Sequence, residues 1–299
     1  MTFTIIGVPI DSVGLGRAEA HGTELAPAAL RAAGLGRSGW PDAGDLDVRI
    51  PDHERDPATG VIGIGGVLAT TDSVRAAVAD TIEDGRRPLV LGGCCTLLPA
   101  ALAGARDASG PLGLVYVDGH LDLYDGVTSP TGEAADMPIA VVLGDGPAAW
   151  VERCGPVPVV DPSAIAILGY RDADELADVG DQLPARRASG ILDIPAERIR
   201  RDGADAAAAA ALQHVQRAAT NLWLHIDLDV LDRDVFPATD YLMPGGLDWP
   251  DLIDLVRPVV AAPGLVGWSI ACYNPEKDPL GRDGRAILDA IDAWCPPAG

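Results

Sequence analysis

Carboxylates and an imidazole are concentrated in two short motifs whose spacing indicates metal chemistry. The first contains Asp118, His120 and Asp122, and the second contains Asp227 and Asp229. Each motif comes directly after an apolar run. Because alternate residues of an extended chain point the same way, the three side chains of the first motif would share one face. Ionisable groups at the end of a buried segment are costly unless compensated, and one or two divalent cations would compensate them directly.

Aspartates that follow a strand have a second explanation, because aspartate often caps the N-terminus of the next helix. Capping accounts for one or two of these residues. It does not account for a D-x-H-x-D motif and a D-x-D motif in one chain. The metal site is therefore the favoured interpretation.

The elements that must position these motifs alternate along the chain. Six nearly continuous apolar runs predict buried strands at 3–8, 88–92, 112–117, 164–168, 222–226 and 265–270. Apolar residues at helical spacing predict helices between them, for example at 25–33, 71–84, 204–219 and 249–260. This alternation predicts an α/β fold with a parallel sheet covered on both faces.

Ligands of open parallel sheets bind beyond the carboxyl ends of the strands. Polar motifs follow four of the predicted strands: GGCCT at 92–96, DGHLD at 118–122, RDAD at 171–174 and DLD at 227–229. The predicted topology would bring carboxylates, one imidazole and two thiols to the same edge of the sheet.

The composition restricts the partners and the location of the protein. The 299 residues carry 44 acidic and 22 basic side chains, a formal net charge of −22. Such a chain repels phosphate backbones and anionic lipids, so neither nucleic acid nor a membrane surface is an expected partner. No apolar run approaches the roughly 20 residues that cross a bilayer, and the N-terminus lacks a basic secretory start, so we expect a cytoplasmic protein. No composition shift marks a boundary, and residues 1–299 are expected to form one domain.

The motifs resemble those of the ureohydrolase family, which includes arginase, agmatinase and formiminoglutamase. The resemblance runs from Gly7 to about Pro275 and is most specific in DGHLD at 118–122 and HIDLDVLDRDVFPAT at 225–239. It implies an arginase-like three-layer αβα sandwich with a central, mostly parallel sheet. It also implies two Mn²⁺ ions, a small-molecule substrate and hydrolysis of a linear C–N bond. Members are often trimers or hexamers, so a homo-oligomer and a monomer both stay open.

The resemblance also implies a ligand for each side of the metal pair. By position, six residues would hold the ions: Asp118 and Asp227 as bridges, His120 and Asp229 on one ion, and Asp122 and Cys95 on the other. Asp122 would in addition orient the attacking water.

Cys95 departs from the family pattern, because arginase has a histidine ligand at this position. A buried structural cysteine is the alternative interpretation. A ligating thiolate would favour softer ions, so Fe²⁺, Co²⁺ or Zn²⁺ are candidates beside Mn²⁺. A cysteine at this position also resembles the Nω-hydroxyarginine hydrolases.

A second departure concerns the proton donor. The position of the arginase proton-shuttle histidine corresponds to Ala135, without gaps from DGHLD. Glu133 and Asp136 are the nearby candidates for a replacement general acid. The hydroxyarginine hydrolases resemble this chain in lacking the histidine, and a hydroxyguanidine is less basic than a guanidine.

A third departure concerns the substrate. Cys272 stands where the family places a glutamate against the guanidinium, so a strong charge-assisted contact would be lost. Asp240 is a candidate acid in its place. The specificity segments of the family map to four further candidate substrate-binding residues: Tyr124, Ser129, Thr131 and Asp174.

These observations predict a dinuclear metal hydrolase acting on amidine-type bonds, with a guanidino or hydroxyguanidino compound as substrate. Two alternatives stay open. One is hydrolysis of a formimino or amide C–N bond, and the other is a catalytically silent homologue that binds metal and a small molecule.

Overall fold

The computed structural model describes residues 2–12, 22–173 and 190–295. Within these ranges eight strands form one sheet: β1 Thr4–Val8, β2 Asp42–Asp45, β3 Pro88–Gly92, β4 Leu112–Val117, β5 Ile165–Leu168, β6 Leu192–Ile194, β7 Asn221–Asp227 and β8 Leu265–Ala271. The strand order is β2-β1-β3-β8-β7-β4-β5-β6, and every paired strand runs parallel to its neighbour. The predicted α/β fold is confirmed.

Two strands were not predicted, and both lie at the edges of the sheet. β2 consists of the polar sequence DAGD and is largely exposed. β6 has three residues, of which only Ile194 is buried. Edge strands bury little apolar surface, so neither strand produces the apolar run that identifies a central strand.

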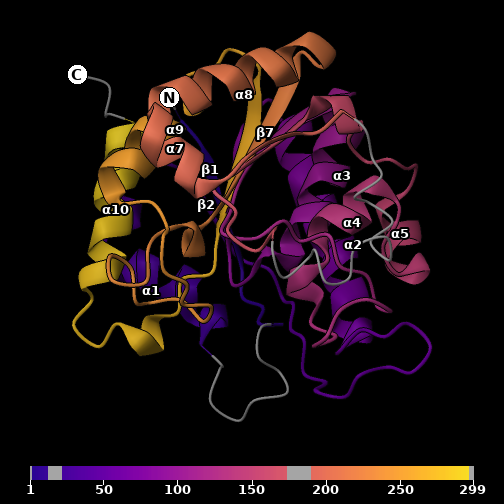
Figure 1. The fold of residues 1–299 in the computed structure, drawn as a ribbon. Helices are drawn as coiled ribbons and strands as arrows, with labels where there is room; N and C mark the ends of the chain where they lie inside the picture. The colour runs from indigo at the N-terminus through magenta and orange to yellow at the C-terminus, as the bar shows by residue number, and fades with distance from the viewer. Residues whose placement is uncertain (1, 13–21, 174–189, 296–299) are drawn as a thin grey trace.

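Helices cover both faces of the sheet, as Figure 1 shows. One layer contains α2 Ile64–Glu83, α3 Leu98–Ser109, α4 Pro138–Leu143 and α5 Ala148–Cys154. The other contains α1 Ala26–Ala33, α7 Ala196–Asp202, α8 Ala204–Ala218, α9 Trp249–Val260 and α10 Arg282–Trp294. The result is a three-layer αβα sandwich.

The central strands are apolar on both sides because each side faces a helical layer. In β4, Leu114 and Tyr116 pack in the core under α2 and α3, whereas Val115 and Val117 pack in the core under α8 and α9. All four side chains are fully buried. This two-sided burial explains why the strand appears in the sequence as an unbroken apolar run.

The strand order brings four carboxyl ends together. β3, β8, β7 and β4 are consecutive in the sheet, although the chain visits them in the order β3, β4, β7, β8. No helix in the described ranges is long and apolar enough to cross a membrane.

Candidate metal centre

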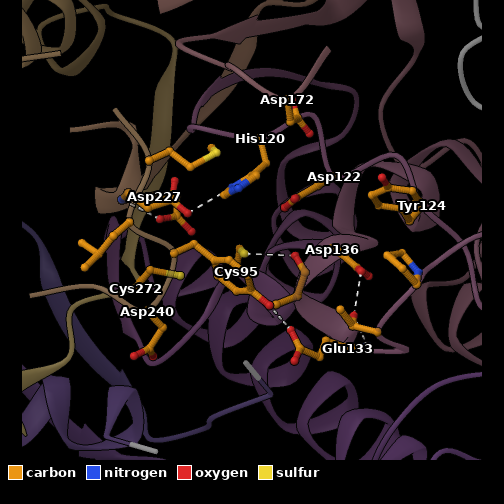
Figure 2. Close-up of a pocket in the computed structure, with 17 residues that line it drawn as sticks. Cys95, His120, Asp122, Tyr124, Glu133, Asp136, Asp172, Asp227, Asp240 and Cys272 are labelled. Atoms are coloured by element: carbon orange, nitrogen blue, oxygen red, sulfur yellow. Dashed lines mark hydrogen bonds and ion pairs between the residues drawn. The ribbon is translucent and has the colours of Figure 1, made fainter. Parts of the chain in front are cut away.

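A row of potential ligands lies along the carboxyl ends of the four central strands, and Figure 2 draws those that line a cavity. Cys95 begins the short helix η3, Cys95–Leu97, just after β3. Cys272 follows β8, Asp227 ends β7, and Asp118 follows β4. The side chains therefore follow the strand order.

The ligand atoms are close enough to share cations. In the described part of the chain, four sets of three residues have ligand atoms within 4.8 Å of one another: Asp118, His120 and Asp229; Cys95, Asp118 and Asp122; Asp118, His225 and Asp227; and Cys95, Asp227 and Cys272. Three of the four sets contain Asp118. All six residues predicted as ligands occur in these sets.

Asp118 and Asp227 each use one oxygen to hold the local backbone. Asp118 Oδ1 accepts a hydrogen bond of 2.7 Å from the His120 N–H. Asp227 Oδ1 accepts one of 2.9 Å from the Asp229 N–H and so caps the short helix Leu228–Val230. Capping is thus real at Asp227, but it occupies only one of the two carboxylate oxygens. Asp118 Oδ2 is buried and has no hydrogen-bond partner among the described residues.

The segment after β4 bends instead of remaining extended. The bend is at Gly119 and His120, and Asp122 has a φ of 49°, in the left-handed region. The predicted extended arrangement of this motif is therefore wrong, because the strand ends at Val117. With this bend, His120 and Asp122 belong to different potential ligand sets, and Asp118 belongs to both sets.

His120 and Asp229 form a close pair on one side of the site. His120 Nδ1 lies 3.1 Å from Asp229 Oδ2, and the Gly119 N–H donates to Asp229 Oδ1 over 3.0 Å. A Cβ at Gly119 would lie 2.7 Å from Asp229 Oδ1, so the close approach needs a glycine or a shift of the carboxylate. Burial raises the pKa of Asp229, but His120 and then Arg171 outweigh it and the net shift is downward.

The remaining carboxylates are destabilised as anions in the metal-free chain. Burial, followed by repulsion from Asp229, raises the pKa of Asp118 to about 6. Burial and neighbouring carboxylates also raise the pKa of Asp122 and of Asp227 well above the usual value. Clustered, buried carboxylates with an orphaned oxygen are the donor set that divalent cations stabilise, so the residues fit a metal pair.

Two cysteines complete the row. The Cys95 thiol donates to the carbonyl oxygen of Ala135 over 3.3 Å. The neighbouring Cys272 thiol, and then burial, raise the pKa of Cys95. A hydrogen bond with Cys95 lowers the pKa of Cys272, but burial and Asp227 outweigh it and the net shift is upward. Without a cation, both groups are neutral thiols at neutral pH.

A cavity of about 490 Å³ opens over the ligand row. Its wall contains most of the metal-ligand candidates and a second group of polar residues: Tyr124, Thr131, Glu133, Asp136, Asp172, Asp240 and Tyr241. Its walls thus combine potential metal ligands with groups that can bind a substrate or move a proton (Figure 2).

Over residues 1–292 the sequence matches the arginase family. The chain belongs to this family. An arginase of Brevibacillus brevis is 31% identical over 252 residues, which cover 82% of this chain and 81% of that protein. The crystal structure of arginase from Bacillus subtilis matches with a TM-score of 0.84 at 27% identity, covering 100% of this chain and 99% of that chain.

The protein is thus a metal-dependent ureohydrolase of the arginase family with an arginase-like fold. The family implies a binuclear metal site, usually with manganese, and candidate ligand sets are present. Proclavaminate amidino hydrolase from Streptomyces clavuligerus shares the fold, with a TM-score of 0.72 at 21% identity and coverage of 98% of this chain and 90% of that chain.

Asp136, one of the two candidate general acids, lies in a hydroxyl network. Its Oδ2 accepts hydrogen bonds from Ser129 Oγ at 2.7 Å and Thr131 Oγ1 at 3.0 Å. Burial raises the pKa of Asp136 to about 7, although these two hydrogen bonds oppose the shift. The other candidate, Glu133, accepts a hydrogen bond from the Tyr241 hydroxyl.

The candidate substrate residues are distributed unevenly. Tyr124, Thr131 and Cys272 line the cavity, whereas Ser129 supports Asp136 from behind the wall and does not line it. Asp174 lies outside the described residues. Asp240 lines the cavity, and its Oδ1 lies 2.6 Å from the ammonium of Lys277.

Two residues were not predicted as metal ligands: His225 and Cys272 each belong to a potential ligand set. Asp172, which the RDAD motif places at the same edge of the sheet without an assigned role, lines the cavity. His225 precedes Asp227 by two positions on β7, a spacing that puts both side chains on one face of the strand. Its ring stacks on Tyr116 with centroids 5.2 Å apart, and its Nδ1 lies 2.7 Å from Ser269 Oγ. Burial lowers the pKa of His225 to about 3, so its imidazole is neutral.

Proposed function

We propose that this ureohydrolase cleaves the C–N bond of a guanidino or hydroxyguanidino compound, with the hydroxyguanidino class preferred. The observation that carries the proposal is the sharing of Asp118 by three potential ligand sets beside a cavity that holds a protonatable acid. When bound there, two divalent cations would lower the pKa of a shared water and stabilise negative charge at the attacked carbon.

The residues of the chain would orient the water and bind the metals. The Tyr116 hydroxyl donates to Asp122 Oδ2 and leaves the other oxygen of this carboxylate for a metal or for the water. We propose the six predicted ligands as the metal set, with Cys95 in place of the family histidine. Mn²⁺ is the expected ion, and Fe²⁺, Co²⁺ or Zn²⁺ are alternatives on the thiol side.

Asp136 is the favoured proton donor. A carboxyl whose pKa is near 7 carries a proton in a substantial fraction of molecules at neutral pH. It can therefore protonate the leaving amine when the C–N bond breaks. After the proton has left Asp136, the hydroxyls of Ser129 and Thr131 stabilise the remaining carboxylate by hydrogen bonds.

The environment of the reacting group favours a weakly basic substrate. Cys272 lines the cavity, and its single sulfur cannot form the bidentate contact that a carboxylate makes with a guanidinium. Asp240 also lines the cavity, but it is already paired with the ammonium of Lys277 at 2.6 Å. A hydroxyguanidine is less basic than a guanidine, so its binding depends less on a free carboxylate.

A substrate panel tests the proposal. The full chain loaded with Mn²⁺ is incubated with guanidines, hydroxyguanidines, amidines and formimino compounds, and the products are identified by mass spectrometry. We expect hydroxyurea or urea together with an amine, and at least about tenfold higher kcat/KM for a hydroxyguanidine than for the matching guanidine, equivalent to about 1.4 kcal/mol. The matched control is Asp118→Asn, which should release nothing.

Other outcomes of the same panel distinguish the alternatives. Formamide release from formimino compounds alone would replace the proposal with formimino hydrolysis. No product from any compound, with both metals bound, would contradict guanidino and hydroxyguanidino hydrolysis alike.

A further inference from the structure

Two thiols and one carboxylate converge on one side of the ligand row. The sulfurs of Cys95 and Cys272 and a carboxylate oxygen of Asp227 all lie within 4.8 Å of one another, and all three residues are buried. Figure 2 shows both cysteine side chains pointing into the same space below Asp227.

The backbone holds Cys272 in this place at a conformational cost. Its φ of 65° lies in the left-handed region, which a residue with a side chain rarely adopts. The Cys272 N–H donates to the carbonyl oxygen of Gly93 over 2.7 Å, which joins the end of β8 to the loop that carries Cys95. No other residue type fits at position 93 without a shift of the backbone, because a Cβ there would lie 1.5 Å from the carbonyl oxygen of Ile10. Strained non-glycine residues of this kind cluster at functional sites.

We propose that Cys272 is a metal ligand and that Cys95, Cys272 and Asp227 form a thiolate-rich position that takes a softer divalent cation than Mn²⁺. Each thiol releases its proton to solvent as its sulfur binds the cation. Asp122, which shares a ligand set with Cys95, would add a carboxylate oxygen to this position. Two sulfur donors select ions such as Zn²⁺, Co²⁺ or Fe²⁺ over Mn²⁺.

The other side of the row has the opposite preference. Asp118, His120 and Asp229 supply only oxygen and nitrogen donors, which suit Mn²⁺. The chain would then hold two different ions, with the softer ion beside β3 and β8 and the harder ion beside β4. This inference rests on the metal centre of the proposed function and does not depend on the identity of the substrate.

Co²⁺ is the probe for the test, because thiolate-to-cobalt charge transfer gives a near-ultraviolet band that oxygen and nitrogen ligands do not give. The metal-stripped full chain is titrated with Co²⁺, and the bound metal is measured after dialysis. We expect a strong band in the wild-type protein, about half of it in Cys272→Ser and in Cys95→Ser, and none in the double variant. Cys94→Ser is the matched control and should keep the full band, because the Cys94 sulfur contacts Ser12 Oγ at 3.1 Å and Thr96 Oγ1 at 3.4 Å instead of the row.

A second measurement avoids mutagenesis. X-ray absorption of the wild-type chain loaded with one equivalent of Zn²⁺ and one of Mn²⁺ should show two Zn–S contacts at about 2.3 Å and no Mn–S contact. A single Zn–S contact, or a full cobalt band in Cys272→Ser, would overturn the role of Cys272. Two bound Co²⁺ ions without any thiolate band would overturn the thiol site, including Cys95 as a ligand, while leaving the proposed C–N bond hydrolysis intact. Failure to bind Co²⁺ or Mn²⁺ at all would overturn both.

Discussion

The ammonium of Lys277 lies 2.6 Å from Asp240 Oδ1 at the wall of the cavity, and it belongs to the only lysine in the sequence. The Asp240 side chain is 5% exposed, and Asn274 Nδ2 also donates to its Oδ1 over 2.9 Å. Lys277→Met would leave a buried carboxylate without its counter-ion. We expect the free energy of unfolding to fall by about 2 kcal/mol, less than for a fully buried pair because the lysine is partly exposed.

The partner substitution provides the check on this ion pair. Asp240→Asn in the Lys277→Met background should recover most of the loss, because the amide carries no charge to compensate. Arg257→Met is the control, since Arg257 pairs with Asp254 at the surface and its loss should cost about 0.5 kcal/mol or less. The free energies of unfolding are measured with urea. Equal losses for Lys277→Met and Arg257→Met would contradict the prediction.

Asp136 should control the response of the reaction to pH. Its pKa of about 7 means that the proton-donating form disappears as the pH rises through 7, so the step that needs this proton should slow on the alkaline side. Asp136→Asn should lower kcat by roughly 10²–10³-fold and remove this dependence. The measurement is kcat between pH 5.5 and 9 with saturating metal.

The hydroxyl network around Asp136 supplies a directional control. Ser129→Ala removes a hydrogen bond that lowers the pKa of Asp136. The pKa should rise, and the fall of kcat should move to higher pH. A shift to lower pH in this variant would contradict the assignment of the pH dependence to Asp136.

Asp227 should determine the occupancy of both cation positions. It shares one ligand set with Asp118 and another with Cys95. Asp227→Ala should therefore reduce binding of both ions, measured by elemental analysis after dialysis. Asp248→Ala is the control, because Asp248 caps α9 through the Asp251 N–H and its loss should cost about 1 kcal/mol of stability without any loss of metal. Full occupancy in the Asp227 variant would refute its role.

The metal-free protein should become more stable in mild acid. The folded-state pKa of Asp118 is raised to about 6, above the value of 3.8 for an unperturbed group, so the folded chain holds this proton more tightly than the unfolded chain. The stability from this group is fully present below about pH 4 and is lost as the pH rises through 6. Melting temperatures of the chelated protein should therefore decrease from pH 5 to pH 8.

Metal and mutation should each reduce this trend. Bound Mn²⁺ stabilises the ionised carboxylates, and one ligand at 100 times its Kd adds about 2.7 kcal/mol. Asp118→Asn should flatten the curve of the metal-free protein, because the amide does not titrate. A metal-free wild type whose stability rises from pH 5 to pH 8 would contradict the prediction.

The sequence predicts those parts of the fold that are buried on both sides. β4 and β7 are found from their apolar runs because each packs between two helical layers. β2 is not found, since its residues Asp42–Asp45 are polar and lie at an edge. A strand that is buried on both faces needs a run of apolar residues, which can be recognised in the sequence, whereas an exposed edge strand does not.

The ligand row is predictable where its residues are close in the chain and unpredictable where they are not. The D-x-H-x-D spacing alone identifies Asp118, His120 and Asp122 as candidate ligands. The contact between Cys95 and Cys272 depends on β3 lying next to β8, strands that are separated by more than half of the sequence. The pairing of Asp240 with Lys277 also depends on the fold, because it joins two segments that lie beyond the ends of β7 and β8. Roles for these residues in catalysis stay predictions.

The position of β8 has a consequence for the synthesis of the protein. β8 is the last strand along the described chain, yet it lies in the middle of the sheet, between β3 and β7. Until residues 265–271 leave the ribosome, β1–β3 and β4–β7 have no strand to join them, and each group exposes an unpaired apolar edge. Such edges promote aggregation, so chains that terminate before residue 265 should depend on chaperones or be degraded. Cys272 follows the joining strand directly, so the nascent chain completes its thiol pair only when the two halves of the sheet can unite.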